Sequence, residues 1–131
     1  MSSEAYDVVK AHYAASDRGD LDGMVADFAD DIAWTEMDGF PYAGTYVGVD
    51  AIKAGVFGRL GQDWKNFRAD PDELVDGGDG TVVGIGHYSG TYRATGKAMR
   101  VRFVHAWRVK DGKVTAFEQF TDTHLVREAM Q

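Results

Sequence analysis

The chain contains no cysteine and only two prolines among its 131 residues. The absence of cysteine excludes a disulfide framework and thiolate chemistry, and it makes a reducing, cytoplasmic location the expected one. Hydrophobic residues make up 44% of the sequence, which is typical of a globular protein. The length fits one domain, residues 1–131, whose core can form without a covalent staple.

Positive charge and long apolar runs are also scarce. Lys and Arg number 14 against 21 Asp and Glu, so the formal net charge is -7, and the basic residues form no cluster. Because this charge repels a phosphate backbone, we expect no nucleic-acid partner. No apolar run reaches the roughly 18 residues of a membrane span, and the first ten residues lack the pattern of a signal peptide. We therefore expect no membrane partner and no export.

Helical patterns dominate the first third of the chain. Residues 3–16 carry apolar side chains at helical spacing after a serine that can cap the helix. Gly19 ends this helix, and Asp20 caps a shorter one over residues 21–28. A third helix is predicted over residues 51–60, capped by Asp50, with apolar side chains facing inward at Ile52, Val56, Phe57 and Leu60.

Strand patterns fill the rest. A first strand is predicted over residues 31–37, and a loop follows it. Four further strands are predicted after the third helix, separated by turns rich in Gly and Asp, and a last helical segment closes the chain. Those strands cover residues 67–75, 81–93, 97–110 and 113–121, and the last helix covers residues 123–130.

Helices followed by an antiparallel meander predict an α+β domain in which the helices cover one face of a bent sheet. Three glycines, Gly84, Gly86 and Gly90, share one face of the strand over 81–93. They either bend the sheet or make room for a ligand on its concave side.

Two stretches identify a family resemblance. The first is GDLDGMV at 19–25, followed by FADD at 28–31, and the second is FVHAWRVKDGKV at 103–114. They resemble the SnoaL-like and ketosteroid isomerase-like branch of the nuclear transport factor 2-like superfamily. The resemblance implies a cone-shaped α+β fold, N-terminal helices packed on a strongly bent, mainly antiparallel sheet, a pocket between them, and commonly a dimer.

The resemblance also implies positions for catalytic groups. Ketosteroid isomerases use a carboxylate base on the first strand and two donors to the oxyanion, a tyrosine on the first helix and a protonated aspartate on a later strand. The base position falls on Glu36, the tyrosine position on His12 with Tyr13 adjacent, and the aspartate position on His105. Because both donors differ from the family's, steroid isomerisation is not expected.

Glu36 and His105 nevertheless form a competent pair, since a carboxylate can remove a proton beside a carbonyl while a histidine polarises the oxygen. Glu36 shares a strand face with Trp34, which favours a raised pKa if that face is buried. If it is not, Glu36 is a rim carboxylate in water. His105 is the single titratable group on an apolar strand face, where it can equally be structural.

Neighbouring side chains complete the predicted pocket. On the first predicted helix Tyr13 is favoured over His12 as a lining residue, because the residue before it can point outward. On the strand over 81–93 Tyr88 is favoured over His87, because adjacent residues of a strand point to opposite faces. Arg100, Arg102 and Arg108 are expected on the face opposite His105. The residues expected to bind substrate are Tyr13, Trp34, Tyr88, Phe103, Trp107, Phe117 and Gln119.

No metal or cofactor is expected. The histidines and Glu36 lack close ligand spacing, and the glycine-rich segment 77–80 joins two strands instead of opening a helix.

Two functions follow. The first is a cofactor-independent isomerase, cyclase or dehydratase that transfers a proton on a small apolar carbonyl compound, with Glu36 as base and His105 as donor. The alternative is a non-catalytic module for small-molecule binding or dimerisation. Apolar residues on both faces of the sheet predict a homodimer that covers the outer face.

Overall fold

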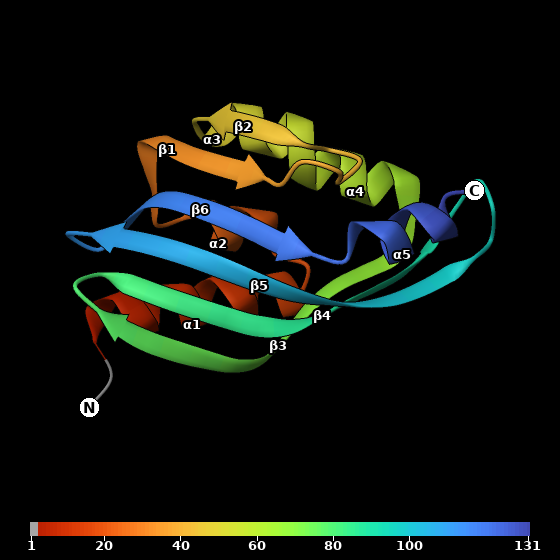
Figure 1. The fold of residues 1–131 in the computed structure, drawn as a ribbon. Coiled ribbons are helices and arrows are strands. Elements are labelled where there is room, and N and C mark those ends of the chain that lie inside the picture. The colour runs from red at the N-terminus through yellow and green to blue at the C-terminus, as the bar shows by residue number, and fades with distance from the viewer. Residues whose placement is uncertain (1–2) are drawn as a thin grey trace.

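The structure, a computed structural model, describes residues 3–131 and contains one six-stranded sheet covered on one face by helices (Figure 1). It confirms the predicted α+β fold. The helices are α1 (Glu4–Asp17), α2 (Leu21–Val25), α3 (Val49–Ile52), α4 (Gly58–Asp63) and α5 (Thr123–Ala129), with a π-helical turn at Lys53–Phe57 between α3 and α4. The strands are β1 (Phe28–Glu36), β2 (Gly44–Val47), β3 (Trp64–Gly78), β4 (Thr81–Tyr92), β5 (Ala98–Lys110) and β6 (Lys113–Thr121).

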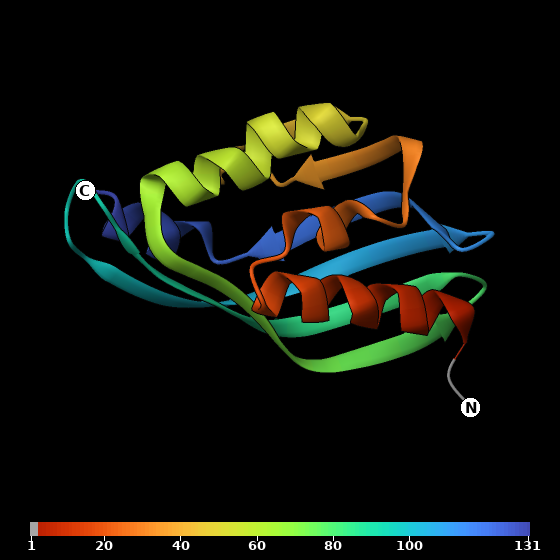
Figure 2. The same cartoon turned by 180° about the vertical axis from the view of Figure 1, so that it is seen from behind.

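The sheet has the order β2-β1-β6-β5-β4-β3, and every neighbouring pair is antiparallel except β1 and β6. Figure 2 shows α1, α2 and the helical segment of residues 49–63 on the same side of the sheet. The long strands β3, β4 and β5 curve, so this covered side is concave (Figure 1). No helix within residues 3–131 is long and apolar enough to cross a membrane.

The two N-terminal helices begin as the sequence predicts. The Ser3 side chain accepts a hydrogen bond from the Tyr6 amide, and the Asp20 side chain accepts one from the Gly23 amide. However, α2 ends at Val25, three residues earlier than predicted. The cause is a contact distant in the sequence: Phe28 pairs with Val114 of β6 and so begins β1.

The third helix is longer than predicted, and its predicted cap is wrong. The segment begins after Gly48, whose φ of 89° favours glycine, and Asp50 lies in the first turn. Its apolar face is as predicted, with Ile52 and Val56 buried. The short edge strand β2, which precedes it, was predicted as loop because its four residues are mostly exposed and show no alternation of burial.

Strand β3 extends well beyond the predicted range 67–75. It lies at the edge of the sheet, where Pro71 is tolerated at a shift of register between Pro71 and Glu73. Here β3 approaches β4 closely, and a Cβ atom at Gly86 would lie 2.1 Å from the Asp70 carbonyl oxygen.

The glycines of β4 therefore serve close packing and not ligand room. Gly86 and Gly90 face the backbone of β3, and a Cβ atom at Gly84 would lie 2.5 Å from the hydroxyl oxygen of Tyr13. The space left by each missing side chain is occupied by protein. The interpretation that these glycines open a pocket is wrong.

The faces of the long strands follow the predicted alternation. On β5, His105 is buried while Arg100, Arg102 and Arg108 are exposed. On β4, Tyr88 is buried, whereas His87 points away and forms a pair with Asp72 in which Nδ1 and Oδ2 are 2.8 Å apart.

Close packing at Gly86 predicts a large effect of one methyl group. We expect Gly86→Ala to lower the free energy of unfolding by roughly 2–3 kcal/mol, because the new Cβ meets backbone that cannot move away. The control Gly61→Ala lies in α4 with no atom near its Cβ and should leave stability unchanged or raise it by up to about 1 kcal/mol. Urea denaturation measures both, and equal stability of the two variants would contradict the packing.

Candidate functional site

A cavity of about 370 Å³ lies between the concave face of the sheet and the helices. The three residues predicted as catalytic, Glu36, His105 and His12, all border it. Five of the residues predicted to bind substrate border it as well: Tyr13, Trp34, Tyr88, Phe117 and Gln119. Phe103 and Trp107 do not. Both side chains point inward, as strand parity predicts, but neither reaches the cavity. Other rings pack against them: Tyr88 and His105 against Phe103, and Tyr13 and Phe117 against Trp107.

A row of polar side chains crosses three strands on the inner face and ends at a glycine on a fourth. Thr35 of β1 pairs with Glu118 of β6, which brings the next residues, Glu36 and Gln119, side by side. Gln119 pairs with His105 of β5, and His105 pairs with Gly84 of β4. Register alone therefore gathers the carboxylate, the amide and the imidazole.

Aromatic side chains enclose this polar row. On one side Trp34 stacks on Phe117, with ring centroids 3.6 Å apart, and Trp107 meets Phe117 edge to face. On the other side Phe103 stacks on His105 at 3.9 Å between centroids. Such surroundings exclude water and strengthen electrostatic interactions.

Glu36 is buried, with 4% of its surface exposed, so it is not a rim carboxylate in water. Burial raises its pKa from 4.5 to about 8, and a hydrogen-bond interaction with the Trp34 side chain acts in the opposite direction. Its Oε2 atom has no hydrogen-bond partner among residues 3–131. Among the described residues, no lysine or arginine borders the cavity to hold the carboxylate ionised.

His105 is held between two tyrosines. Its Nδ1 lies 2.6 Å from the Tyr13 hydroxyl oxygen and its Nε2 lies 2.6 Å from the Tyr88 hydroxyl oxygen. The Tyr13 hydroxyl accepts a hydrogen bond from Nε1 of Trp107, and the Tyr88 hydroxyl accepts one from Nε2 of Gln119. Burial lowers the pKa of His105 well below 6.5, so the imidazole is neutral.

These contacts change the role predicted for His105. Both of its ring nitrogens are occupied by tyrosine hydroxyls, so neither is free to donate to a ligand. A hydrogen bond to a ligand oxygen must therefore come from Tyr13 or Tyr88. His105 positions these hydroxyls.

His12 and Tyr13 both border the cavity. The expectation that Tyr13 lines it in preference to His12 is therefore wrong for His12. The His12 Nδ1 donates to the carbonyl oxygen of Met24 over 2.9 Å, because a carbonyl can only accept. Burial lowers the pKa of His12 to about 4, which leaves its Nε2 as an unprotonated acceptor.

Other residues that line the cavity were not among those predicted to bind substrate. Phe57 and Leu60 lie on the inward face predicted for the third helix, and that face was the signal that could have placed them. Phe40 follows β1 in a loop and Phe67 lies on β3, and no pattern in the sequence marks either as lining. Within residues 3–131, no group of three or more metal-ligating side chains gathers.

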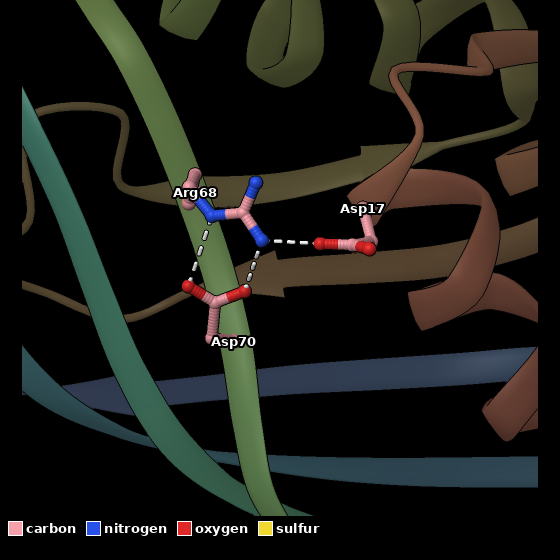
Figure 3. Close-up of polar contacts among 3 residues, drawn as sticks. All are labelled: Asp17, Arg68 and Asp70. Atoms are coloured by element: carbon pink, nitrogen blue, oxygen red, sulfur yellow. Dashed lines mark hydrogen bonds and ion pairs between the residues drawn. The ribbon is translucent and has the colours of Figure 1, made fainter.

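An ion-pair cluster ties helix α1 to strand β3 beside the cavity (Figure 3). Arg68 bonds to Asp70 on its own strand and to Asp17 at the end of α1, and these carboxylates raise the pKa of its guanidinium further. Its chain neighbours Phe67 and Ala69 border the cavity. The cluster thus holds together the two elements that form this wall.

The buried carboxyl predicts an unusual dependence of stability on pH. Between pH 4.5 and about 8 the folded state keeps the Glu36 proton while the unfolded state has lost it, so rising pH favours unfolding. Raising the pH from 4.5 to 8 should therefore lower the free energy of unfolding by on the order of 4 kcal/mol, at roughly 1.4 kcal/mol per pKa unit.

We therefore expect Glu36→Gln to be more stable than the wild type at pH 8 and to lose this advantage at pH 4.5. Urea denaturation at both values measures it. Glu118→Gln, an exposed change of the same chemistry on β6, is the control. A stability difference between Glu36→Gln and wild type that does not change with pH would show that the carboxyl ionises as it does in water.

Comparison with known proteins agrees with this architecture. Residues 9–117 match the family model of the SnoaL-like domain. A search among curated proteins found no match.

Solved structures cover almost the whole chain. An NTF2-like protein from Burkholderia thailandensis is 55% identical, covers 100% of this chain and 99% of its own, and has a TM-score of 0.95. TerC, which was co-crystallised with polyporic acid, is 29% identical over 98% of both chains, with a TM-score of 0.86. A ketosteroid isomerase-like protein from Catenulispora acidiphila, in complex with trimethylamine, shares the fold at 18% identity and a TM-score of 0.80, covering 94% of this chain and 91% of its own.

The family match over residues 9–117 and the structural similarity lead to one conclusion: the chain belongs to the SnoaL-like family of NTF2-like proteins.

Proposed function

We propose that the protein is a cofactor-independent enzyme that transfers a proton on a small, largely apolar carbonyl compound, in an isomerisation, cyclisation or dehydration. The observation that carries the proposal is the carboxyl of Glu36, buried in an aromatic cavity with one oxygen unpartnered and no cation beside it. A structural carboxylate would have its hydrogen bonds satisfied by the protein.

Glu36 acts as the base in this proposal. A carboxylate with a pKa of about 8 is far more basic than one in water, so it can remove a proton from carbon beside a carbonyl. The negative charge that develops on the carbonyl oxygen requires a hydrogen-bond donor. Tyr13 or Tyr88, on either side of His105, supplies that donor, with the histidine as its support.

The cavity favours a neutral ligand with a flat apolar body. No lysine or arginine borders it to bind a carboxylate or phosphate group, and Trp34, Phe40, Phe57, Phe67 and Phe117 form much of its wall. Its volume of about 370 Å³ lies at the small end of ligand pockets. The co-crystallisation of the similar TerC with polyporic acid supports a small-molecule ligand.

The alternative of a non-catalytic binding module would be supported by an open carboxylate with no pocket behind it. Glu36 is instead buried and borders the cavity, which supports the enzyme.

Turnover should depend on the carboxylate. We expect Glu36→Gln to lower kcat by roughly 10²–10⁴-fold on any compound that the wild type converts, because an amide cannot accept the proton. The assay is turnover of a panel of enones, polyketide-like ketones and polyporic acid. Glu118→Gln is the control, and binding of a panel member without conversion by the wild type would favour the alternative.

The pH profile follows from the same group. Only the ionised carboxylate can act as base, so kcat/KM should rise with pH and level off above the pKa of about 8. Rates measured from pH 6 to 10 on an active substrate test this. A profile that levels off near pH 5 would show that the base ionises as it does in water.

We also propose that the protein forms a homodimer through the outer face of the sheet. Phe120 of β6 and Val104 of β5 are cross-strand partners, and 46% and 38% of their surfaces are exposed. A homodimer would cover this pair, which lies on the two central strands of the face that the helices leave uncovered.

Phe120→Lys should convert the dimer to a monomer, because it would place charge in the interface. Val75→Lys on the edge strand β3 is the control. Light scattering at micromolar concentration measures the mass, and a monomeric wild type would contradict the proposal.

A further inference from the structure

The two short contacts of His105 allow a count of protons. Each contact, Tyr13 hydroxyl to Nδ1 and Tyr88 hydroxyl to Nε2, needs one proton between its two heavy atoms. The neutral imidazole carries one proton and each hydroxyl carries one, which makes three protons for two hydrogen bonds. One proton is therefore left over, and it belongs to a tyrosine.

Two arrangements satisfy the count. If Nδ1 carries the histidine proton, it donates to Tyr13, Tyr88 donates to Nε2, and the hydroxyl of Tyr13 keeps a spare proton. If Nε2 carries it, Nε2 donates to Tyr88, Tyr13 donates to Nδ1, and Tyr88 has the spare proton. The bonds from Trp107 and Gln119 are the same in both, because the hydroxyl oxygens accept them.

The surroundings of the two hydroxyls differ. The Tyr13 hydroxyl oxygen presses against the backbone of β4, since a Cβ atom at Gly84 would lie 2.5 Å from it. Its two polar neighbours among residues 3–131 are His105 and Trp107, and neither can take another proton from it in the first arrangement. A spare proton there would have no acceptor.

Tyr88 instead accepts a hydrogen bond from Gln119 and lies close enough to Glu36 to feel its charge. Burial raises the pKa of Tyr88 well above 10, and above about pH 8 the ionised carboxylate of Glu36 acts in the same direction. A negative charge nearby favours the arrangement in which the hydroxyl proton turns toward it. The other titratable groups here are His12 and Tyr13. Burial lowers the pKa of His12 and raises the pKa of Tyr13, so both are uncharged at neutral pH.

We propose that His105 is protonated on Nε2 and that Tyr88 therefore presents the free hydroxyl proton to the ligand oxygen. His105 is the positioning residue, because its Nε2 proton occupies the Tyr88 oxygen and leaves the tyrosine's own proton for the cavity. The identity of the ligand as a carbonyl compound rests on the proposed function, whereas the tautomer of His105 does not.

The unpartnered atoms near Tyr88 describe the ligand further. Oε1 of Gln119 and Oε2 of Glu36 are buried acceptors without a hydrogen-bond partner among residues 3–131. Nε1 of Trp34 is a buried donor that lies close enough to Glu36 to lower the pKa of its carboxyl, so we do not assign it to the ligand. These residues all border the cavity. A ligand that suits them has a carbonyl oxygen for Tyr88, and beside it a hydroxyl or an acidic C–H for Gln119 and Glu36. This is the pattern of an enolisable or hydroxylated ketone.

The tautomer can be measured directly. Long-range ¹H–¹⁵N correlation NMR on protein labelled with ¹⁵N-histidine distinguishes protonated from bare ring nitrogens, and His105→Gln assigns the signals of His105. We expect Nε2 to be protonated and Nδ1 bare at about pH 9, above the pKa of Glu36. His12 is the internal control, because its bond to the Met24 carbonyl requires a proton on Nδ1.

Each other outcome overturns the proposal. A proton on Nδ1 of His105 would give the spare proton to Tyr13. Protons on both nitrogens would leave both tyrosines with a spare proton and remove the distinction between them.

A pair of ligand probes tests the functional consequence. We expect the wild type to bind 2-acetylnaphthalene roughly tenfold more tightly than 2-ethylnaphthalene, the value of one good hydrogen bond. Tyr88→Phe should lose this preference and Tyr13→Phe should keep it, as measured by titration calorimetry. Loss of the preference in Tyr13→Phe alone would overturn the assignment of the donor.

The two proposals fail separately. A proton on Nε2 together with a ketone preference that depends on Tyr88, but without turnover of any ketone, would contradict the enzyme and support the donor. If the protein bound neither probe, the proposed ligand class would be contradicted. The NMR measurement of the His105 tautomer would then still show which tyrosine has the spare proton.

Discussion

The site depends on the burial of one carboxyl group among aromatic rings. Removing Glu36 from water raises the free energy of its ionised form, and nothing charged beside it compensates. The sheet tolerates this because the proton stays on the carboxyl group until about pH 8. The same desolvation that destabilises the ionised group raises its basicity, so stability and the proposed role as a base oppose each other at this residue.

The hydrogen-bonded chain beside Glu36 is polar but carries no charge. It runs from Trp107 through Tyr13, His105 and Tyr88 to Gln119, and its members come from α1 and three strands. It links the helix to the sheet, and the missing side chain of Gly84 is what allows the tyrosine of α1 to reach the imidazole. A packing feature of β4 thus determines the geometry of the site.

Sequence reasoning predicted the residues of the site better than their roles. The family resemblance placed Glu36 and His105 at one site, and period-two alternation placed Phe117 and Gln119 on one face of the last strand. All four residues border the cavity. Alternation could not distinguish Phe103, which has the same parity as His105, because a pattern gives the direction of a side chain and not its depth. Sequence reasoning also gave His105 a free nitrogen that the tyrosines in fact occupy.

The sequence by itself determined the α+β class, the caps at Ser3 and Asp20, the turns and the inward faces, because these follow from local periodicity and turn chemistry. Tertiary structure decided the parallel pairing of β1 with β6, the end of α2, the closeness of Gly86 to β3 and the partners of His105. These depend on contacts between residues far apart in the chain, which short-range patterns do not contain.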